Sequence, residues 1–594
     1  MLKGRDTSNP NSLANGHAKD ATNVSTQEVT NGRASWNLID ESYKLLQTGI
    51  LDNPLINKSL PKDAATYASK VKFTGHTQPA IPIPWRFAES VSALKALEAI
   101  TVGGLLKAKY GVEAQDVEIN VDHAQLFVMS TLLTNVFVDG VPSVATSPAV
   151  AQFYPSVDIH RSGVSPHRTC ATNIYRTKDD RFFHLHGSMN PSIIMQAIGM
   201  PEDMEGDFEE AAQRYQEKLK GYTAQELQHL SSVVTKQAGT ICWSIDEFKE
   251  SEHGKANAHV GLWETHYHAN PAQKAGWWAD SPQTSPARPL AGLKIVDLTR
   301  IIAAPAVTRG LAELGASVMR ITAPHLQDMG RLHPDLGWGK WNCSLDFRKP
   351  EDLEKAKALI MEADVVVSGY RPAVLDKYGL GESGILELTK NRGRGIVFAR
   401  ENCYGWNGPW QGRSGWQQIS DACCGVSLEF GRAMGNEEAV TPVFPNSDYC
   451  TGIAGASGIV DALMQRAEKG GSYTVDVALN YYSQWLVNSV GMYPKDVWED
   501  AWQRNGRKVM RHYYPMGRLL PLYFEMLAES SPYLFSEEFF EIREAKAVGT
   551  KVRTVKPIVQ WKSGVVKPGF QVSARRNGID QPRWPEDLMV ELVE

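Results

Sequence analysis

The most constraining feature of this 594-residue chain is a regular alternation of short apolar runs and helical segments that begins near residue 290. A chain with this pattern folds as a parallel sheet with helices on both faces, because each parallel connection needs a crossover long enough to hold a helix. The predicted class is therefore α/β, with a doubly wound parallel sheet. The predicted strands are residues 294–298, 317–321, 364–368, 395–399 and 473–477, and the predicted helices are 305–314, 350–363 and 448–467.

A Pro/Ser-rich segment at residues 280–289 separates this part of the chain from the part before it. Segments of this composition are typical of linkers. The first 35 residues are rich in Asn, Ser, Thr and Gly and lack an apolar core, which predicts a disordered tail. We therefore expect a tail at 1–35, an N-terminal unit at 36–279, a linker at 280–289 and a C-terminal unit at 290–594.

The composition argues against two classes of partner. Sixty-two basic and sixty-seven acidic residues give a net charge of −5 without a basic block, so we expect no nucleic-acid partner. No stretch approaches the roughly 18 apolar residues of a membrane span, so no membrane partner is expected. Asp6, Asp20 and Glu28 disfavour a transit peptide, and the seven cysteines are odd in number and form no CxxC pair. A reducing cytoplasm fits these features best.

Asp448 is the leading candidate for a reactive side chain. Pro445 breaks the preceding structure, Ser447 is a suitable helix N-cap, and Asp448 then falls in the first turn of the predicted helix. The helix dipole and the free amides there favour the ionised carboxylate by roughly 0.3–1 kcal/mol. The small residues that follow, Gly452 among them, permit a close approach to the backbone. On local sequence alone, Asp448 fits either a residue that assists the cap or a nucleophile.

Two other motifs indicate ordinary structure. Residues 379–384 match GxGxxG, but residues 371–378 separate them from the preceding strand, so a loop is predicted rather than a dinucleotide site. His-x-His pairs stand at residues 184–186 and 266–268. Alternate strand residues share a face and suit metal ligation, yet no third ligand stands at a recognisable spacing. We therefore predict no metal site.

Basic residues of the second half lie where a sheet of this class binds its ligand. Lys340, Arg371, Lys377 and Arg400 each stand at or just past a predicted strand or turn. Each one alone suits a solvated surface position, whereas the set suits the phosphates of a nucleotide-like ligand.

The first half contains a partial repeat of the second. A helix that ends in a basic, glycine-containing turn and feeds an alternating strand occurs at residues 105–121 and again at 463–477. The offset of about 356 residues places the counterpart of Asp448 among residues 89–92, which contain no Asp. The first half thus resembles a copy without the nucleophile.

Five motifs, in order along the chain, resemble the family III coenzyme A transferases, which include formyl-CoA, carnitine-CoA and succinyl-CoA-dependent transferases and the related alpha-methylacyl-CoA racemases. The motifs are PLAGLKIVDLT (289–299) with Ala304, Pro305 and 314–316; SLDFR (344–348); ADVVVSGYRP (363–372) with Leu375 and 378–380; YGWNGP (404–409); and Ser447 with Asp448 and Gly452. The resemblance is strong over 289–480, weaker over 80–285 and poor over 480–594. It implies a Rossmann-like CoA-transferase domain with a partial, degenerate second copy and a small α+β domain.

The resemblance also implies a chemistry. Asp448 occupies the position of the family's catalytic aspartate, which attacks an acyl-CoA to give an aspartyl anhydride and then an aspartyl-CoA thioester. Coenzyme A enters as the thioester substrate, a carboxylic acid is the second substrate, and no further cofactor is implied. Family members form interlocked dimers, so a homodimer or an intrachain pseudo-dimer with one working site is expected. The CoA-contacting positions map onto Lys340, Gly369, Tyr370, Arg371, Lys377, Asn402, Cys403, Tyr404 and Gly405.

Departures from the family pattern leave two alternatives open. The family's Gln after the first strand is Ile302, its Arg after the second strand falls at Ala323, and its Asn-Arg-Lys stretch reads differently at 339–342, so phosphate binding is expected to differ. Racemases need a second base, a His about 30 residues before the Asp, and residues 415–419 contain none. The leading hypothesis is a CoA-transferase; an acyl-CoA racemase or epimerase and a catalytically silent CoA-binding homologue are the alternatives.

Overall fold

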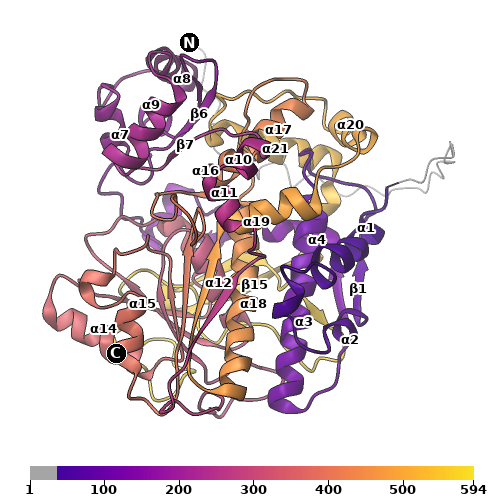
Figure 1. The fold of residues 1–594 in the computed structure, drawn as a ribbon, viewed down its shortest axis with the longest axis vertical. Coiled ribbons are helices and arrows are strands. Elements are labelled where there is room, and N and C mark those ends of the chain that lie inside the picture. Colours follow the sequence, from indigo (N-terminus) through magenta and orange to yellow (C-terminus); the bar gives the residue numbers. More distant parts are fainter. Residues whose placement is uncertain (1–35) are drawn as a thin grey trace.

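A seven-stranded sheet forms the centre of the computed structural model, which describes residues 36–594 (Figure 1). Six strands run parallel and the seventh, β8, is antiparallel to β14 at one edge. In spatial order the strands are β11 (Lys340–Ser344), β10 (Ser317–Thr322), β9 (Lys294–Leu298), β12 (Val365–Ser368), β13 (Val397–Asn402), β14 (Ser472–Ala478) and β8 (Glu264–His268). The predicted tail at 1–35 lies outside the described residues.

Helices cover both faces of this sheet. Helices α12 (Ala303–Glu313) and α18 (Asn446–Lys469) pack on one face, and α14 (Pro350–Glu362) and α15 (Glu382–Thr389) pack on the other. Successive strand residues serve opposite cores, so Val365 and Val367 face α12 and α18 while Val366 faces α14 and α15. The doubly wound α/β class is confirmed.

The element bounds follow the prediction closely, with one correction at the start of α18. Strand β9 has the predicted bounds. Helix α18 begins two residues earlier than expected, at Asn446, so Pro445 and not Ser447 holds the N-cap position. The prediction that Ser447 caps this helix is therefore wrong: its hydroxyl is buried within the first turn without a hydrogen-bond partner. No side chain caps the amides at this helix start.

The N-terminal unit wraps one side of the central domain. Its first elements are α1 (Leu38–Leu45), η1 (Leu46–Leu51), α2 (Ala64–Ala68), β1 (Val71–Thr74), α3 (Phe87–Tyr110), β2 (Val117–Asn120), α4 (Val121–Phe127), α5 (Ser130–Leu133), β3 (Asn135–Val138) and β4 (Val141–Val144). A small α+β domain with a three-stranded sheet follows, built from α6 (Pro166–Thr169), β5 (Asn173–Arg176), β6 (Phe182–Leu185), α7 (Pro191–Ala197), α8 (Phe208–Leu219), α9 (Ala224–His229) and β7 (Gly239–Ile241). Helices α10 (Ile245–Glu250) and α11 (Glu252–Asn257) then lead to β8.

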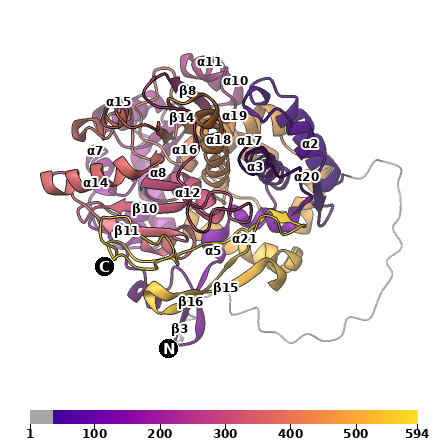
Figure 2. The ribbon, with the colours of Figure 1, turned by 90° about the horizontal axis from the view of Figure 1, so that it is seen from below.

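The C-terminal third returns to the N-terminal unit. Strands β15 (Phe540–Ala545) and β16 (Thr550–Val555) form a four-stranded sheet with β3 and β4, and Figure 2 shows β15, β16 and β3 together. Strand β17 (Gln560–Trp561) pairs with β2. The remaining helices of the second half are α13 (His333–Leu336), α16 (Gln417–Cys423), α17 (Val426–Ala433), α19 (Leu479–Trp485), α20 (Lys495–Arg504) and α21 (Met516–Ser530). No helix among the described residues is both long and apolar enough to cross a bilayer.

The partial repeat corresponds to a real structural duplication. Helices α3 and α18 both have 24 residues, lie side by side, and are each followed by a strand and a seven-residue helix, α4 or α19 (Figures 1 and 2). The sheet β1-β2-β17 repeats the order and strand directions of β13-β14-β8. Glu89 and Asp448 are each the third residue of their helix. The first copy thus keeps only the edge of the sheet and carries Glu89 at the position of Asp448.

Candidate active site

The candidate site lies at the carboxyl ends of the central strands, the edge at which open parallel sheets bind ligands. Strands β9, β12 and β13 end there, and helices α12 and α18 both begin there. Neither helix has a side-chain cap, so the amides of Ala303 and Ala304 in α12 and of Ser447 and Asp448 in α18 have no acceptor within their own helix. Ile301, between β9 and α12, has φ of +73°, a conformation that is strained for a β-branched residue and typical of functional sites.

Asp448 is placed at this edge by the packing of α18 on α12. A Cβ added to Gly452, one turn after Asp448, would lie 2.6 Å from the Cβ of Ala306. The close approach that the small residues permit is thus made by another helix, and it draws the first turn of α12 toward Asp448. Tyr449, the next residue, points away toward the N-terminal unit, where its hydroxyl donates to Asp335 at 2.9 Å.

The Asp448 carboxyl is not stabilised as an anion in the way the sequence predicts. Burial raises its pKa to about 7, and no other group offsets this effect. The favourable helix dipole is worth only ~0.3–1 kcal/mol, so desolvation outweighs it. A carboxylate that is ionised at neutral pH but poorly solvated is a better nucleophile than one stabilised by hydrogen bonds.

Two further acids, which the sequence analysis did not single out, interact electrostatically with Asp448. Burial and the Asp448 charge raise the pKa of Glu401, at the end of β13, to about 8. The same two causes raise the pKa of Asp421, in α16, well above its ordinary range, and Gln417 donates a hydrogen bond to it. An acidic residue after the apolar run of β13 was the available signal for Glu401. The charges of three carboxyls therefore interact in a region where water solvates them poorly.

The small α+β domain of the N-terminal unit covers this edge of the sheet (Figure 1). The ring of His186 stacks on Trp416 with centroids 5.4 Å apart, and the backbone amide of Trp243 donates to Ala422 O at 3.0 Å. A shared apolar cluster joins the two units through Ala238, Phe248, Ala303, Cys403, Tyr404, Ile419, Cys423, Cys424 and Leu479. The N-terminal unit therefore supplies one wall of the site.

Two of the four basic residues proposed for phosphate binding are engaged inside the protein. Lys340 is buried, its ammonium lies 3.2 Å from an Asp297 carboxylate oxygen and donates to Pro305 O at 2.8 Å, and burial lowers its pKa to about 8. Arg400 binds both carboxylate oxygens of Asp476 and one of Glu382, the last at 2.7 Å. Each of these two residues contributes a structural ion pair.

The other two, with their neighbours, lie on the rim of the site. Arg371 is exposed and donates to Lys236 O of the small domain at 3.1 Å, and Lys377 is exposed beside the Tyr378 ring. Gly369 is exposed directly after β12, and Tyr370 stacks under the Arg300 guanidinium at 5.5 Å. The structure thus brings 369–371 together at the rim.

Residues Asn402 to Gly405 form a closed turn beneath the site. The side-chain oxygen Oδ1 of Asn402 accepts from the Gly405 amide at 2.8 Å, and the Asn402 side-chain NH₂ group donates to Gly405 O at 3.0 Å. Gly405 has φ of +102°, which only glycine adopts without strain. The Cys403 thiol and Tyr404 are buried in the shared apolar cluster. The side chains of Asn402, Cys403 and Tyr404 are thus used to shape the turn. Glu401 is the polar residue next to this turn that the turn does not engage.

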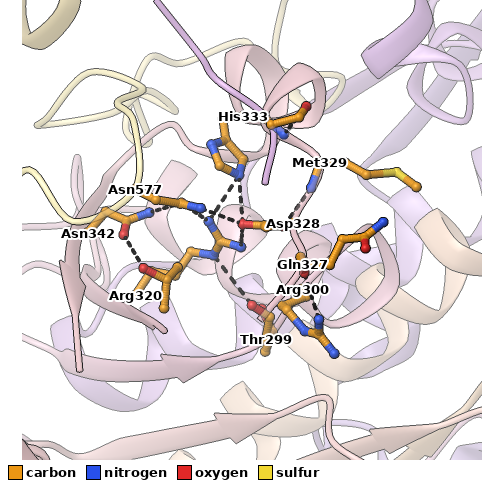
Figure 3. A network of polar contacts seen from close by, with 12 residues as sticks. Thr299, Arg300, Arg320, Gln327, Asp328, Met329, His333, Asn342 and Asn577 are labelled. Atoms are coloured by element: carbon orange, nitrogen blue, oxygen red, sulfur yellow. Dashed lines mark hydrogen bonds and ion pairs between the residues drawn. The ribbon is translucent and has the colours of Figure 1, made fainter. Parts of the chain in front are cut away.

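A buried polar network closes the far end of the strand edge (Figure 3). Arg320 of β10 donates to Asp328 at 2.8 Å and to Asn577 at 2.9 Å, and His333 Nε2 lies 3.2 Å from Asp328. Asn577 also accepts from Asn342 at 3.0 Å. The network ties the loop after β10 and the C-terminal segment to the strand ends.

Neither His-x-His pair joins the carboxyls of Asp448, Glu401 and Asp421, although His186 stacks on Trp416 at the wall of the site. His184 is buried in β6, and His266 of β8 lies 3.1 Å from Asp476. Ligand atoms of Glu264, His266 and Asp476 come within 4.8 Å of one another. The Arg400 guanidinium already neutralises Asp476 there.

Comparison with known proteins identifies the family. The model of CoA-transferase family III matches residues 290–516. An acetyl-coenzyme A transferase of Hypoxylon pulicicidum is 49% identical over 553 residues, covering 92% of this chain and 93% of the relative. An acyl-CoA transferase of Gibberella moniliformis is 32% identical over 523 residues, covering 84% and 88%. A solved CaiB/BaiF family protein from Brucella suis is 27% identical, covers 34% of this chain and 56% of its own, and has a TM-score of 0.30.

The chain belongs to CoA-transferase family III. It is an enzyme of the CoA-transferase class, and the Hypoxylon and Gibberella relatives match it over most of their own length.

Proposed function

We propose that the protein moves coenzyme A from an acyl-CoA thioester to a carboxylic acid, with Asp448 as the nucleophile. The observation that carries the proposal is the Asp448 carboxyl itself. It stands at the ligand-binding edge of the sheet, beside two uncapped helix starts, and makes no hydrogen bond or ion pair with another described side chain. A carboxylate left without a protein partner is available to a substrate.

The reaction is a sequence of acyl and CoA exchanges on one carboxylate. An Asp448 oxygen attacks the thioester carbonyl, the C–S bond breaks, and a mixed anhydride and CoA thiolate result. The thiolate attacks the Asp448 carbonyl, which releases the donor acid and leaves an aspartyl-CoA thioester. The acceptor carboxylate then attacks this thioester, and the thiolate returns to the new acyl group and frees Asp448. The acyl groups stay activated throughout, so no ATP is needed.

The oxyanions of this sequence would form near the first turns of α12 and α18. Free backbone amides at a helix start favour negative charge and need no rearrangement to meet it. The small domain above the site would exclude water, which matters because an anhydride hydrolyses readily.

Covalent trapping tests the nucleophile. The protein is incubated with a panel of acyl-CoA thioesters, beginning with acetyl-CoA, and the mixture is treated with hydroxylamine. We expect a hydroxamate on the tryptic peptide that contains Asp448, and its complete loss in Asp448→Ala. Glu387→Gln, at an exposed position of α15, is the matched control and should retain the adduct.

Two outcomes would favour the alternatives. Solvent exchange of the substrate α-proton without an adduct would indicate a racemase. CoA binding, measured by calorimetry, with neither adduct nor exchange would indicate a silent binding protein.

A further inference from the structure

We propose that Glu401 is the proton donor and acceptor for the CoA sulfur, and that it shares a single negative charge with Asp448 through the catalytic cycle. The inference rests on the proposed function and assigns a second residue to that site. Glu401 lies outside the motifs that carry the family resemblance.

The geometry places both carboxyls at one point of the strand edge. Val397, Ala399 and Glu401 alternate along β13 on the face that α12 and α18 cover. A Cβ built on Gly369 would lie 3.8 Å from Glu401 Oε2 and 3.0 Å from the Cβ of Ala304, so the Glu401 carboxyl reaches the first turn of α12.

Asp448 faces the same turn from the other side. It stands one turn before Gly452, and a Cβ built on Gly452 would lie 2.6 Å from the Cβ of Ala306 in α12. The two carboxyls therefore flank the start of α12, and their charges interact.

Neither carboxyl is used by the fold. Among the described residues, Glu401 and Asp448 make no side-chain hydrogen bond or ion pair, and each keeps some exposed surface. Several buried acids of the described chain do have a cationic partner, such as Asp297 with Lys340 and Glu89 with Arg86. Two unpaired carboxyls side by side at a ligand-binding edge cost stability, which is typical of groups retained for chemistry.

The groups around Glu401 and Asp448 permit one of the two carboxyls to be ionised and disfavour the ionisation of both. The titratable groups that face the pair are Asp421 of α16 and the thiols of Cys403 and Cys423, and α12 presents alanines. No cation of the described chain lowers the pKa of either carboxyl. Like carboxyls in a poorly solvated site ionise one at a time, so an ionised Asp448 keeps Glu401 protonated.

This arrangement balances the first chemical step. An Asp448 oxygen forms a bond to the thioester carbon, the C–S bond breaks, and its electron pair leaves on sulfur. Asp448 becomes a neutral anhydride, so the charge that held the Glu401 proton disappears, and that proton moves to sulfur. The products are CoA thiol and a Glu401 carboxylate. In the next step the thiol returns its proton to Glu401 as sulfur attacks the anhydride and the donor acid leaves as a carboxylate.

The proton affinities suit this transfer. A free thiol has a pKa of ~8.5. Burial and the Asp448 charge raise the pKa of Glu401 to about 8 in the free enzyme, and the loss of that charge on acylation lowers it again. The thiolate is then the stronger base, so the proton passes from Glu401 to sulfur.

The experiment compares Glu401→Gln with the wild-type enzyme, with acetyl-CoA as the donor. Gln has the size and neutrality of a protonated Glu but carries no transferable proton. We expect acylation of Asp448 to slow by ~100-fold. The wild-type rate should rise as Asp448 ionises near pH 7 and fall as the Glu401 proton is lost above about pH 8; the variant should lack the alkaline fall. Glu401→Asp should restore part of the rate, and Glu387→Gln should match the wild type.

An infrared titration of the free enzyme gives a readout that does not depend on turnover. The protonated carboxyl band of Glu401 should disappear as the pH rises through about 8 and be absent from Glu401→Gln. A variant with the wild-type rate and pH profile overturns the role of Glu401. A wild-type enzyme that forms no Asp448 adduct with any donor overturns the proposed function instead, even where the Glu401 band titrates as expected.

Discussion

At the scale of single residues, the site depends on carboxyls that the fold leaves unsatisfied. Asp448 could be singled out from sequence because it falls in the first turn of a recognisable helix, and the family resemblance then pointed to it as the nucleophile. Its burial, however, involves the packing of α18 on α12, which is distant in sequence, so the direction of its pKa shift could not be predicted. Glu401 was missed for the same reason: its position shows only a polar residue after an apolar strand.

Asp448→Asn is predicted to stabilise the protein at neutral and alkaline pH. The pKa of Asp448 is raised to about 7 in the folded state, against ~3.9 in an unfolded chain. The stability that its protonation provides is present below pH 4 and is lost as the pH rises to 7, by at most ~1.4 kcal/mol per pH unit. Asn remains neutral at every pH. The melting temperature of the variant should therefore exceed that of the wild type at pH 8 and equal it at pH 4. Equal melting curves at both pH values would contradict the raised pKa.

At the scale of elements, the second half was predictable and the pairing of the two halves was not. Parallel strands such as β9 and β12 are buried on both faces and read as apolar runs, so their bounds are visible in sequence. Strand β8 pairs with β14 across some two hundred residues, and only tertiary structure shows that His266 and Thr474 are neighbours. The start of α18 was misplaced because Ser447 looks like a cap, whereas Pro445 already fixes the helical φ.

The contact between α12 and α18 predicts opposite effects for two Gly→Ala changes. Gly452→Ala would place a Cβ 2.6 Å from Ala306 Cβ and 3.3 Å from its backbone, so the helices must separate. We expect a loss of ~1–3 kcal/mol in unfolding free energy and slower acylation of Asp448. Gly310→Ala meets only Ala456 Cβ, at 3.7 Å, and should be neutral or gain ~0.5–1 kcal/mol. Chemical denaturation of both variants checks the pair; equal effects would contradict this packing.

At the scale of the whole molecule, the two units complete each other. The N-terminal unit supplies β8 to the central sheet and the small domain above the site, and the C-terminal unit supplies β15, β16 and β17 to the sheets of the N-terminal unit. We expect residues 290–594 expressed alone to be insoluble or molten. Co-expression with residues 36–289 should restore a folded complex. A C-terminal fragment with a cooperative melting transition would contradict this interdependence.

The duplication further predicts one working site per chain. Glu89 occupies the helix position of Asp448, but its carboxyl lies 3.1 Å from the Arg86 guanidinium and accepts from Tyr493 at 2.8 Å. A paired carboxylate is a weak nucleophile, and the first copy retains only β1, β2 and β17 of a ligand-binding sheet.

Intact-protein mass spectrometry after incubation with acetyl-CoA should therefore show one acyl or CoA adduct per chain at saturation. Glu89→Gln should retain that adduct, because Glu89 is not at the site, and Asp448→Ala should show none. Calorimetric titration should give one CoA per chain at any oligomeric state. Two adducts per chain, or an adduct that survives Asp448→Ala and is lost in Glu89→Gln, would mean that the first copy has kept a site of its own.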